Sequence, residues 1–272
     1  MTPLTAPCIF CGSVAEAASE EHVIPKWARR AFHIQGPVTV RASDWPDPER
    51  KDVDRLQHLN VTLTDALCEN CNSKWLGPIE GRVARVLRPM MVNAAPAVLD
   101  TRDQGLLAFW AVKTILLLEL SVRQMFPGAR AIEGYAATAP ELAWLRAREE
   151  PPPRSMVWLG CWDCKRENPL MYEPSAAPLP AADGRPLSGH LATFALGFAV
   201  FQVFTVNFVA AEQAGARVWN PNPPAPIRAA LPRIWPPLAR TPNIRWPTPA
   251  FPRDDWHRIV TWNGALRLRS PA

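Results

Sequence analysis

The chain opens with Cys8-Ile9-Phe10-Cys11-Gly12 and continues, through Glu21-His22-Val23-Ile24-Pro25, to Cys68-Glu69-Asn70-Cys71-Asn72. Each cysteine pair has the Cys-x-x-Cys spacing of a turn that presents two thiolates to one metal ion. Four thiolates at about 2.3 Å complete the tetrahedral shell that Zn²⁺ prefers, and this closed shell leaves no position for a substrate. We therefore expect Cys8, Cys11, Cys68 and Cys71 to bind one structural zinc ion, without which so small a module should unfold.

A carboxylate, an imidazole and an amide lie close to these cysteines in the sequence, at Glu21, His22 and Asn72. Carboxylate and amide oxygens are hard ligands that suit Mg²⁺ or Mn²⁺, and a neutral imidazole takes a proton from water near neutral pH. An ion shared by Glu21 and Asn72 would stabilise a scissile phosphate while His22 activates water on its far side. The competing interpretation is a histidine that only forms hydrogen bonds within the fold, and we prefer it for His33 and His58.

The order Cys-x-x-Cys, acidic-His-hydrophobic-x-Pro and Cys-x-x-Cys-Asn resembles the HNH (His-Me finger, ββα-metal) endonucleases in their zinc-bearing, treble-clef-like form, similar to endonuclease VII-type nucleases. The resemblance covers roughly the first third of the chain. It implies that Glu21 and Asn72 hold a catalytic Mg²⁺ or Mn²⁺, that His22 is the general base, and that the substrate is DNA. Lys74, which follows Asn72 closely, is a candidate for contact with a phosphate.

The chain departs from the family pattern at three positions. Glu21 stands where Asp or His is more usual, and Leu63 stands where many members have an asparagine that braces the loop. Leu76 occupies the common ligand position four residues after Asn72, and we expect the next acidic residue, Glu80, to form a salt bridge. These departures favour an alternative function, a non-enzymatic, zinc-stabilised protein that binds nucleic acid through a degenerate HNH site.

Composition and charge narrow the class of protein. Apolar residues make up 48% of the 272 residues, which is enough for a globular core. Residues 226–272 hold 8 arginines against 2 acidic residues, whereas residues 1–95 balance 11 basic with 11 acidic residues. A basic terminal segment favours a polyanion such as nucleic acid, although a solvated surface explains it equally well. The first residues lack a signal peptide's basic and apolar regions, so we expect a cytoplasmic, reduced chain whose paired cysteines bind metal.

The residue patterns predict an α+β fold in two domains, a ββα-metal (treble-clef-like) module at residues 1–92 and a larger α+β domain at residues 93–272. Residues 43–55 are polar and are expected to be turn-like. Apolar spacing predicts helices at residues 25–32, from Asn72 to Pro89, at 103–126 and at 141–150. Alternation predicts strands at residues 38–40, 59–63, 156–159 and 170–172.

Leu191–Ala210 carries no charge over 20 residues, which is the length of a membrane span. Because it is rich in β-branched and aromatic residues with polar ones between them, we expect a buried β-hairpin or a long bent strand, and no membrane partner. Residues 220–252 are rich in proline and are expected to be irregular, and Trp256–Leu268 is expected to form a strand or a strand pair. Cys161 and Cys164 form a third Cys-x-x-Cys pair without further ligands, and we interpret it as a turn at a strand end with free thiols.

The residues and the resemblance together predict a metal-dependent HNH endonuclease that hydrolyses phosphodiester bonds in DNA. They leave open whether the substrate is DNA or RNA and whether the chain forms a homo-oligomer. A regulatory or toxin-like protein that assembles through Leu191–Ala210 is a further alternative.

Overall fold

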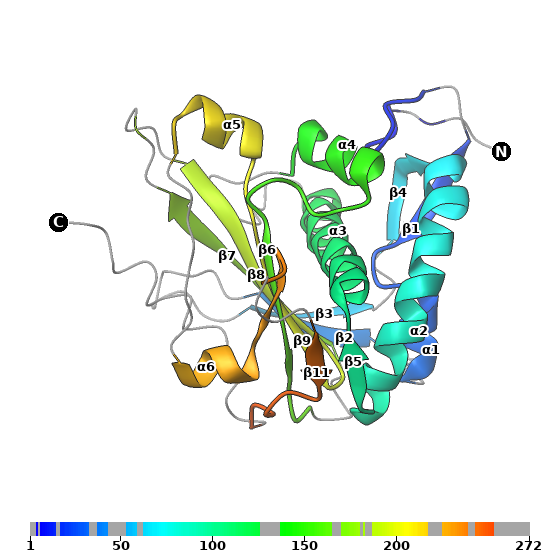
Figure 1. The fold of residues 1–272 in the computed structure, drawn as a ribbon. Coiled ribbons are helices and arrows are strands. Elements are labelled where there is room, and N and C mark those ends of the chain that lie inside the picture. The colour runs from blue at the N-terminus through cyan, green and yellow to red at the C-terminus, as the bar shows by residue number, and fades with distance from the viewer. Residues whose placement is uncertain are drawn as a thin grey trace.

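The computed structural model describes residues 4, 6–14, 17–32, 37–42, 53–58, 62–125, 137–164, 170–179, 182, 187–216, 225–238 and 243–252. These residues mix helices and strands, which confirms the predicted α+β class. In Figure 1 the elements lie in layers, with a central sheet between two groups of helices and the N-terminal segments beyond the longest helix.

The N-terminal segment forms two antiparallel strands followed by a helix. Strand β1 (Ala18–His22) pairs with β4 (Thr62–Cys68), and a π-helical segment, η1 (Asn70–Leu76), leads directly into helix α2 (Gly77–Asn93). The helix expected after the second cysteine pair is therefore confirmed, with Asn72 in its first turn. The turn geometry changes from π to α at Gly77, where the next residue, Pro78, has no N–H to offer the preceding turn.

Helix α2 does not end at Pro89, as the sequence predicted, but continues to Asn93. Pro89 lies in the last turn, so its missing N–H costs one hydrogen bond close to the helix end. Met90 and Met91 are fully buried and hold that turn against the core. Ala94 then ends the helix in the left-handed conformation, with its N–H donated to the Met90 carbonyl oxygen.

The central sheet is antiparallel, with the strand order β10-β6-β9-β8-β7. Its strands are β6 (Met156–Cys161), β7 (Leu170–Leu179), β8 (Leu187–Leu196), β9 (Ala199–Thr205) and β10 (Arg233–Trp235). The uncharged Leu191–Ala210 stretch supplies the β8–β9 hairpin, which confirms the prediction of a buried hairpin. Its residues in β8 and β9 are buried, so they offer no apolar surface for assembly.

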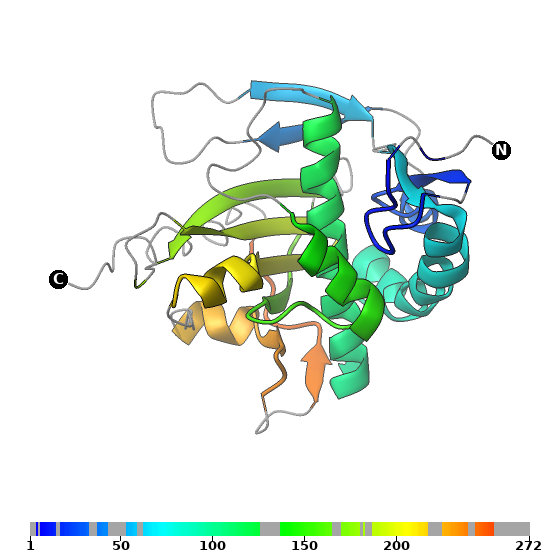
Figure 2. The same cartoon turned by 90° about the horizontal axis from the view of Figure 1, so that it is seen from above.

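Helix α3 (Thr101–Met125) covers one face of this sheet, and short helices cover the other (Figure 2). The Trp110 ring of α3 packs edge-on against Phe194 and Phe201 at 5.9 and 5.8 Å between ring centroids. On the opposite face, residues of α5 (Phe208–Gln213) and α6 (Ala225–Ala230) pack against apolar side chains of the sheet. Within the described residues, α3 alone is long and apolar enough to cross a membrane, but 83% of that stretch is buried inside the molecule.

The remaining elements are short. They are α1 (Lys26–Ala31), β2 (Pro37–Ala42), β3 (Val53–His58), β5 (Ala97–Leu99), α4 (Ala139–Arg148) and β11 (Ile244–Trp246). Two predictions are corrected here. The polar segment at 43–55 contributes its end to β3, which pairs with β2, and the segment at 220–252 forms α6, β10 and β11.

Long-range pairing explains the second correction, because β10 pairs with β6 and β11 with β5, partners that local composition does not reveal. The predicted strand at 59–63 overlaps β4 only from Thr62, and its earlier residues lie outside the described ranges. The strand predicted for Trp256–Leu268 also lies outside them.

One hydrophobic core joins the two predicted domains. Phe10, beside the first cysteine pair, packs edge-on against Trp75 of η1 at 5.1 Å between ring centroids. Trp75 packs in turn against Phe109 of α3 at 6.1 Å. The cysteine-bearing segment is therefore attached to the central helix by aromatic contacts, and the boundary at residue 92 stays a prediction.

Candidate functional site

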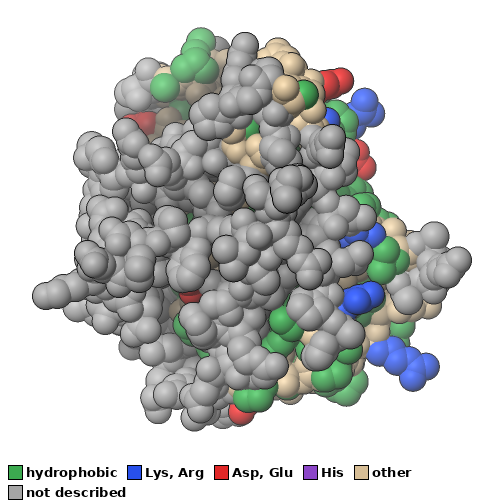
Figure 3. Space-filling view, turned by 90° about the vertical axis from the view of Figure 1, so that its left-hand side faces the viewer, with side chains coloured by type: hydrophobic (Ala, Val, Ile, Leu, Met, Phe, Trp, Pro, Cys, Tyr) green, Lys and Arg blue, Asp and Glu red, His purple; other side chains and the backbone are tan. Residues whose placement is uncertain are grey.

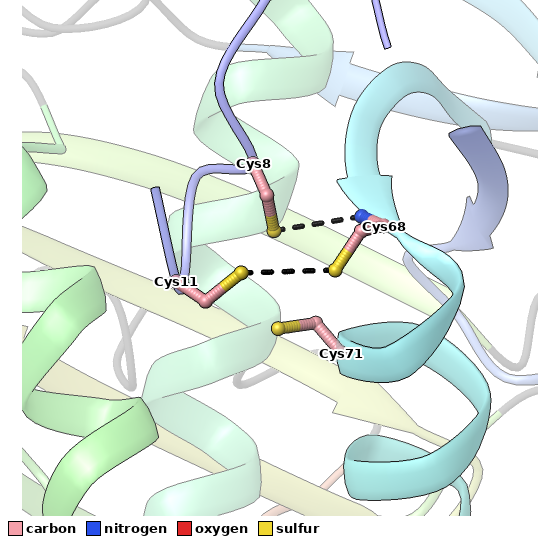
Figure 4. A group of neighbouring side chains, drawn as sticks. All are labelled: Cys8, Cys11, Cys68 and Cys71. Atoms are coloured by element: carbon pink, nitrogen blue, oxygen red, sulfur yellow. Dashed lines mark hydrogen bonds between the residues drawn. The ribbon is translucent and has the colours of Figure 1, made fainter. Parts of the chain in front are cut away.

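The four N-terminal cysteines converge from two segments that lie far apart in the sequence (Figure 4). Cys8 and Cys11 lie on a turn closed by the Gly12 N–H, which donates to the Cys8 carbonyl oxygen at 2.8 Å. Gly12 has a φ of +73°, a conformation that glycine adopts without strain. Cys68 is the last residue of β4, and Cys71 lies in η1.

The sulfur atoms have the spacing that one tetrahedral ion needs. All four lie within 4.8 Å of one another, and the Cys11 and Cys68 sulfurs are 3.7 Å apart. A tetrahedron with metal–sulfur bonds of about 2.3 Å has edges of about 3.8 Å. The four cysteines can therefore hold a structural metal ion, as their spacing predicted. Among the described residues, this is the one group of three or more His, Cys, Asp or Glu side chains so placed.

Backbone N–H groups prepare one of these thiols for metal binding. Burial raises the pKa of Cys8, but hydrogen bonds from the backbone of Cys68, Cys11 and Phe10 outweigh it and lower the pKa to about 7. The Cys68 N–H donates to the Cys8 sulfur at 3.4 Å. N–H groups aimed at a sulfur stabilise the thiolate, which is the form that binds metal.

His22 lies at the opposite end of β1 from the cysteines. Ala18 is paired with Cys68 and His22 with Thr62, so a strand length of roughly 13 Å separates the cysteine cluster from the imidazole. A metal ion held by the cysteines is too far away to act on a group bound at His22. This placement agrees with a structural role for the cysteine site.

The imidazole of His22 is half-buried and lies among cations. Burial lowers the pKa of His22 below 6.5, and the positive charges of Lys26 and Arg29 on α1 lower it further, against smaller opposing effects of Glu20 and Glu80. At neutral pH the ring is therefore uncharged, which is the state that a general base requires.

Glu21, the neighbour of His22, points into the protein and is paired with a lysine. Its residue is 3% exposed, and its carboxylate accepts a hydrogen bond from Lys113 Nζ of α3 at 3.2 Å. The same ammonium donates to the Glu80 carboxylate of α2 at 2.9 Å. Burial lowers the pKa of Lys113, but the two carboxylates, Glu80 first, outweigh burial and raise it. Glu80 thus forms the salt bridge that its position predicted.

Asn72 uses its side-chain amide to fasten η1 to β1. Its Nδ2 donates to the Ser19 hydroxyl at 2.8 Å and to the Glu20 carbonyl oxygen at 2.9 Å. The amide therefore contacts the two strand residues that precede Glu21, whereas the Glu21 carboxylate is bonded to Lys113. Lys74, the candidate for phosphate contact, is exposed in the same helical segment.

The arrangement of Glu21 and Asn72 does not fit a hard divalent ion. The Glu21 carboxylate is almost completely buried and already faces the Lys113 ammonium, whose charge opposes a second cation. The neighbouring position across the strand pair is Leu63, which is buried and offers no ligand atom. The predicted catalytic ion therefore has no suitable ligand set at Glu21 in this arrangement.

Lys113 is the charged residue of this site that sequence reasoning missed, together with its pairing to Glu21. The available signal was a lysine in the middle of the apolar helix Thr101–Met125, because a lysine at such a position is rarely buried without a partner. Its partners lie 92 and 33 residues away, so the sequence did not identify them.

The third cysteine pair stays apart from this site. Cys161 ends β6, and both Cys161 and Cys164 are buried and form no disulfide, as expected. Burial, with smaller contributions from Cys164 and Asp163, raises the pKa of Cys161 to about 11, which keeps it protonated and unreactive.

No family model, no curated protein and no solved structure matches this chain. The resemblance to HNH endonucleases therefore stays a prediction. What bears on it is the local geometry: a cysteine cluster, two antiparallel strands, a helix, and a neutral histidine at the far end of the first strand.

Proposed function

We propose that the chain is an HNH-type endonuclease that hydrolyses phosphodiester bonds in DNA, with His22 as the general base. The observation that carries this proposal is the position of His22 at the end of β1, half-buried, uncharged at neutral pH and beside Lys26 and Arg29. A neutral imidazole can accept a proton from water, and adjacent cations can neutralise a phosphate and its developing charge.

In this proposal the four cysteines hold Zn²⁺, and the module has the treble-clef-like form of that family. Thiolate ligands in a tetrahedral set are typical of structural zinc sites. The ion would join the turn at Cys8–Cys11 to the start of η1, which fixes the strand pair on which His22 is carried. Zinc would therefore support activity by holding the fold, not by contacting the substrate.

Each residue near His22 would have a limited task. The imidazole would take the proton of the water as its oxygen attacks phosphorus, while Lys26 and Arg29 would bind the phosphate oxygens. One ester P–O bond would break, and the leaving sugar oxygen would take a proton from solvent. Asn72 would keep β1 in place through its bonds to Ser19 and Glu20. No step of this scheme passes through an ion at Glu21, because that carboxylate is paired with Lys113.

A nicking assay on supercoiled plasmid tests the proposal. Zinc-loaded protein would be incubated with Mg²⁺, with Mn²⁺ or with EDTA, and its zinc content would be measured afterwards. We expect nicking by the natural chain and a loss of about 100-fold or more in His22→Ala. His33→Ala, which alters a histidine that we assign no part in catalysis, should nick normally. Equal nicking by His22→Ala, or none by a folded zinc-loaded protein under any condition, would reject the proposal.

A second candidate function is binding of nucleic acid without cleavage. The pairing of Glu21 with Lys113 favours it, because a module that has lost its catalytic ion can still bind phosphates. Among the described side chains on the face in Figure 3, basic, acidic and apolar groups are interspersed. About half of the basic C-terminal segment, residues 239–242 and 253–272, lies outside the described residues. This function predicts salt-sensitive DNA binding that His22→Ala leaves unchanged, with no nicking by either protein.

A further inference from the structure

Three elements meet at one buried ammonium group. Lys113 lies in the middle of α3 and its side chain is 0% exposed. Two carboxylates reach its Nζ from elsewhere in the fold, Glu21 of β1 at 3.2 Å and Glu80 of α2 at 2.9 Å. The side chain of Glu21 is 4% exposed and that of Glu80 is 19% exposed, so Glu80 is the most exposed member of the group.

The Lys113 ammonium supplies a positive charge at the Glu21 carboxylate, as a bound metal ion would. In the proposed HNH module the residue before the general base should hold a divalent ion, and that residue is Glu21. Its carboxylate instead faces a fixed positive charge supplied by the chain itself. A divalent ion at the same carboxylate would lie beside the ammonium in a poorly solvated region, where like charges repel strongly.

We propose that Lys113 permanently fills the cation position of the module, so that the natural chain takes up no divalent ion through Glu21. This inference rests on the proposed function for the identity of that position. Lys113 is a positioning residue, since a fully buried side chain cannot touch DNA. It fixes Glu21, and through the strand it fixes the adjacent His22, in the way that a metal ion would otherwise do.

The inference predicts that removing the ammonium opens a metal site. In Lys113→Ala, two carboxylates would face an emptied volume, and oxygen ligands of this kind suit Mn²⁺. The double variant Lys113→Ala/Glu21→Gln loses one of the two carboxylates, so it should lose the new site. The four-cysteine site is unchanged in all of these proteins.

Mn²⁺ binding to the zinc-loaded full chain, followed by electron paramagnetic resonance, tests this directly. We expect no bound Mn²⁺ in the natural chain, one equivalent in Lys113→Ala, and none in the double variant. Mn²⁺ bound by the natural chain and lost in Glu21→Gln would overturn the inference, as would a folded Lys113→Ala protein that binds none. If Lys113→Ala does not fold, the comparison of the natural chain with Glu21→Gln still decides, because Glu21→Gln keeps the Lys113–Glu80 pair.

The nicking assay separates this inference from the proposed function. Nicking that persists in buffer freed of divalent ions, with zinc retained, agrees with both. A different result would be nicking that requires Mg²⁺, with both nicking and Mn²⁺ binding lost in Glu21→Gln. That result would support the endonuclease proposal and overturn the inference about Lys113. If no nicking occurs at all, the endonuclease fails, and the Mn²⁺ measurement alone decides what occupies the cation position.

Discussion

His22 can act as a base only while its imidazole is neutral. Burial lowers its pKa below 6.5, and Lys26 and Arg29 lower it further because a third positive charge beside them is unfavourable. The ring therefore gains its proton at a lower pH than the ring of an ordinary histidine. We expect kcat/KM for DNA cleavage to decline with falling pH at a lower pH than it would for a histidine of ordinary pKa. A pH profile of initial nicking rates measures this.

Charge removal beside the ring provides the control for that profile. Lys26→Gln or Arg29→Gln should move the acidic limb to higher pH, whereas Arg30→Gln, an exposed neighbour outside the interaction, should leave it in place. If neither Lys26→Gln nor Arg29→Gln moves the acidic limb, the titrating group is not His22.

Asn72 gives a second test at the scale of single residues. Asn72→Asp keeps an oxygen ligand but loses the N–H donor, and it sets a carboxylate against the Glu20 carbonyl oxygen. We expect it to lower the free energy of unfolding by about 1–3 kcal/mol, measured by urea denaturation. Ser73→Asp adds the same charge at an exposed neighbouring position and should change it by less than about 0.5 kcal/mol. An equal loss of unfolding free energy in the two variants would mean that the hydrogen bonds of the Asn72 side chain contribute nothing to stability.

The residues of the site differ in how well the sequence revealed them. The metal-binding role of the four cysteines follows from their spacing alone, because each Cys-x-x-Cys pair makes a local turn that presents two thiols to one ion. The role of Lys113 does not follow from sequence spacing, because its carboxylate partners are brought to it by the packing of α3 against β1 and α2. Local patterns identify groups that act within one turn, and they miss groups that meet only through tertiary structure.

At the scale of elements, the β8–β9 hairpin depends on Gly197. Its φ is +56°, and a Cβ atom there would lie 2.0 Å from the Met91 carbonyl oxygen and 2.6 Å from a ring carbon of Phe32. We expect Gly197→Ala to lower the free energy of unfolding by about 2–5 kcal/mol, since it adds backbone strain to an overlap with α2. Chemical denaturation measures the loss.

Gly81→Ala is the matched control, because Gly81 lies in α2 with open space around its missing Cβ. Alanine is a better helix former than glycine, so this variant should be more stable by up to about 1 kcal/mol. If Gly197→Ala proved as stable as the natural chain, the close approach of the hairpin to α2 would be refuted.

Helices and the buried hairpin were predictable because their patterns are long and regular. Apolar spacing identified α3 and the start of α2, and the uncharged Leu191–Ala210 stretch identified β8 and β9. The end of α2 was not predictable, since burial of Met90 and Met91 outweighs the helix-ending tendency of Pro89. Short strands such as β10 and β11 owe their conformation to distant partners, and three residues carry too little pattern to show it.

At the scale of the whole molecule, the metal ion should stabilise more than its own loop. The ring contacts from Phe10 through Trp75 to Phe109 continue the cysteine-bearing segment into the central core. We therefore expect removal of the ion with a strong chelator to lower the Tm of the whole chain rather than to melt a separate N-terminal unit. Differential scanning calorimetry with metal analysis measures both quantities.

Cysteine variants check which thiols are responsible. Cys68→Ser should lose the bound ion and show the lowered Tm, whereas Cys161→Ala should keep one ion per chain. Two separate thermal transitions, of which only the first responds to chelation, would support two independent domains with a boundary near residue 92 instead of one shared core.

The endonuclease proposal is tested most directly by measuring DNA binding and DNA cleavage on the same zinc-loaded preparations of the natural chain and His22→Ala. The proposal predicts equal zinc content and equal affinity for the two proteins, with cleavage by the natural chain alone. Cleavage by both proteins, or binding without cleavage by a folded natural chain, would contradict it.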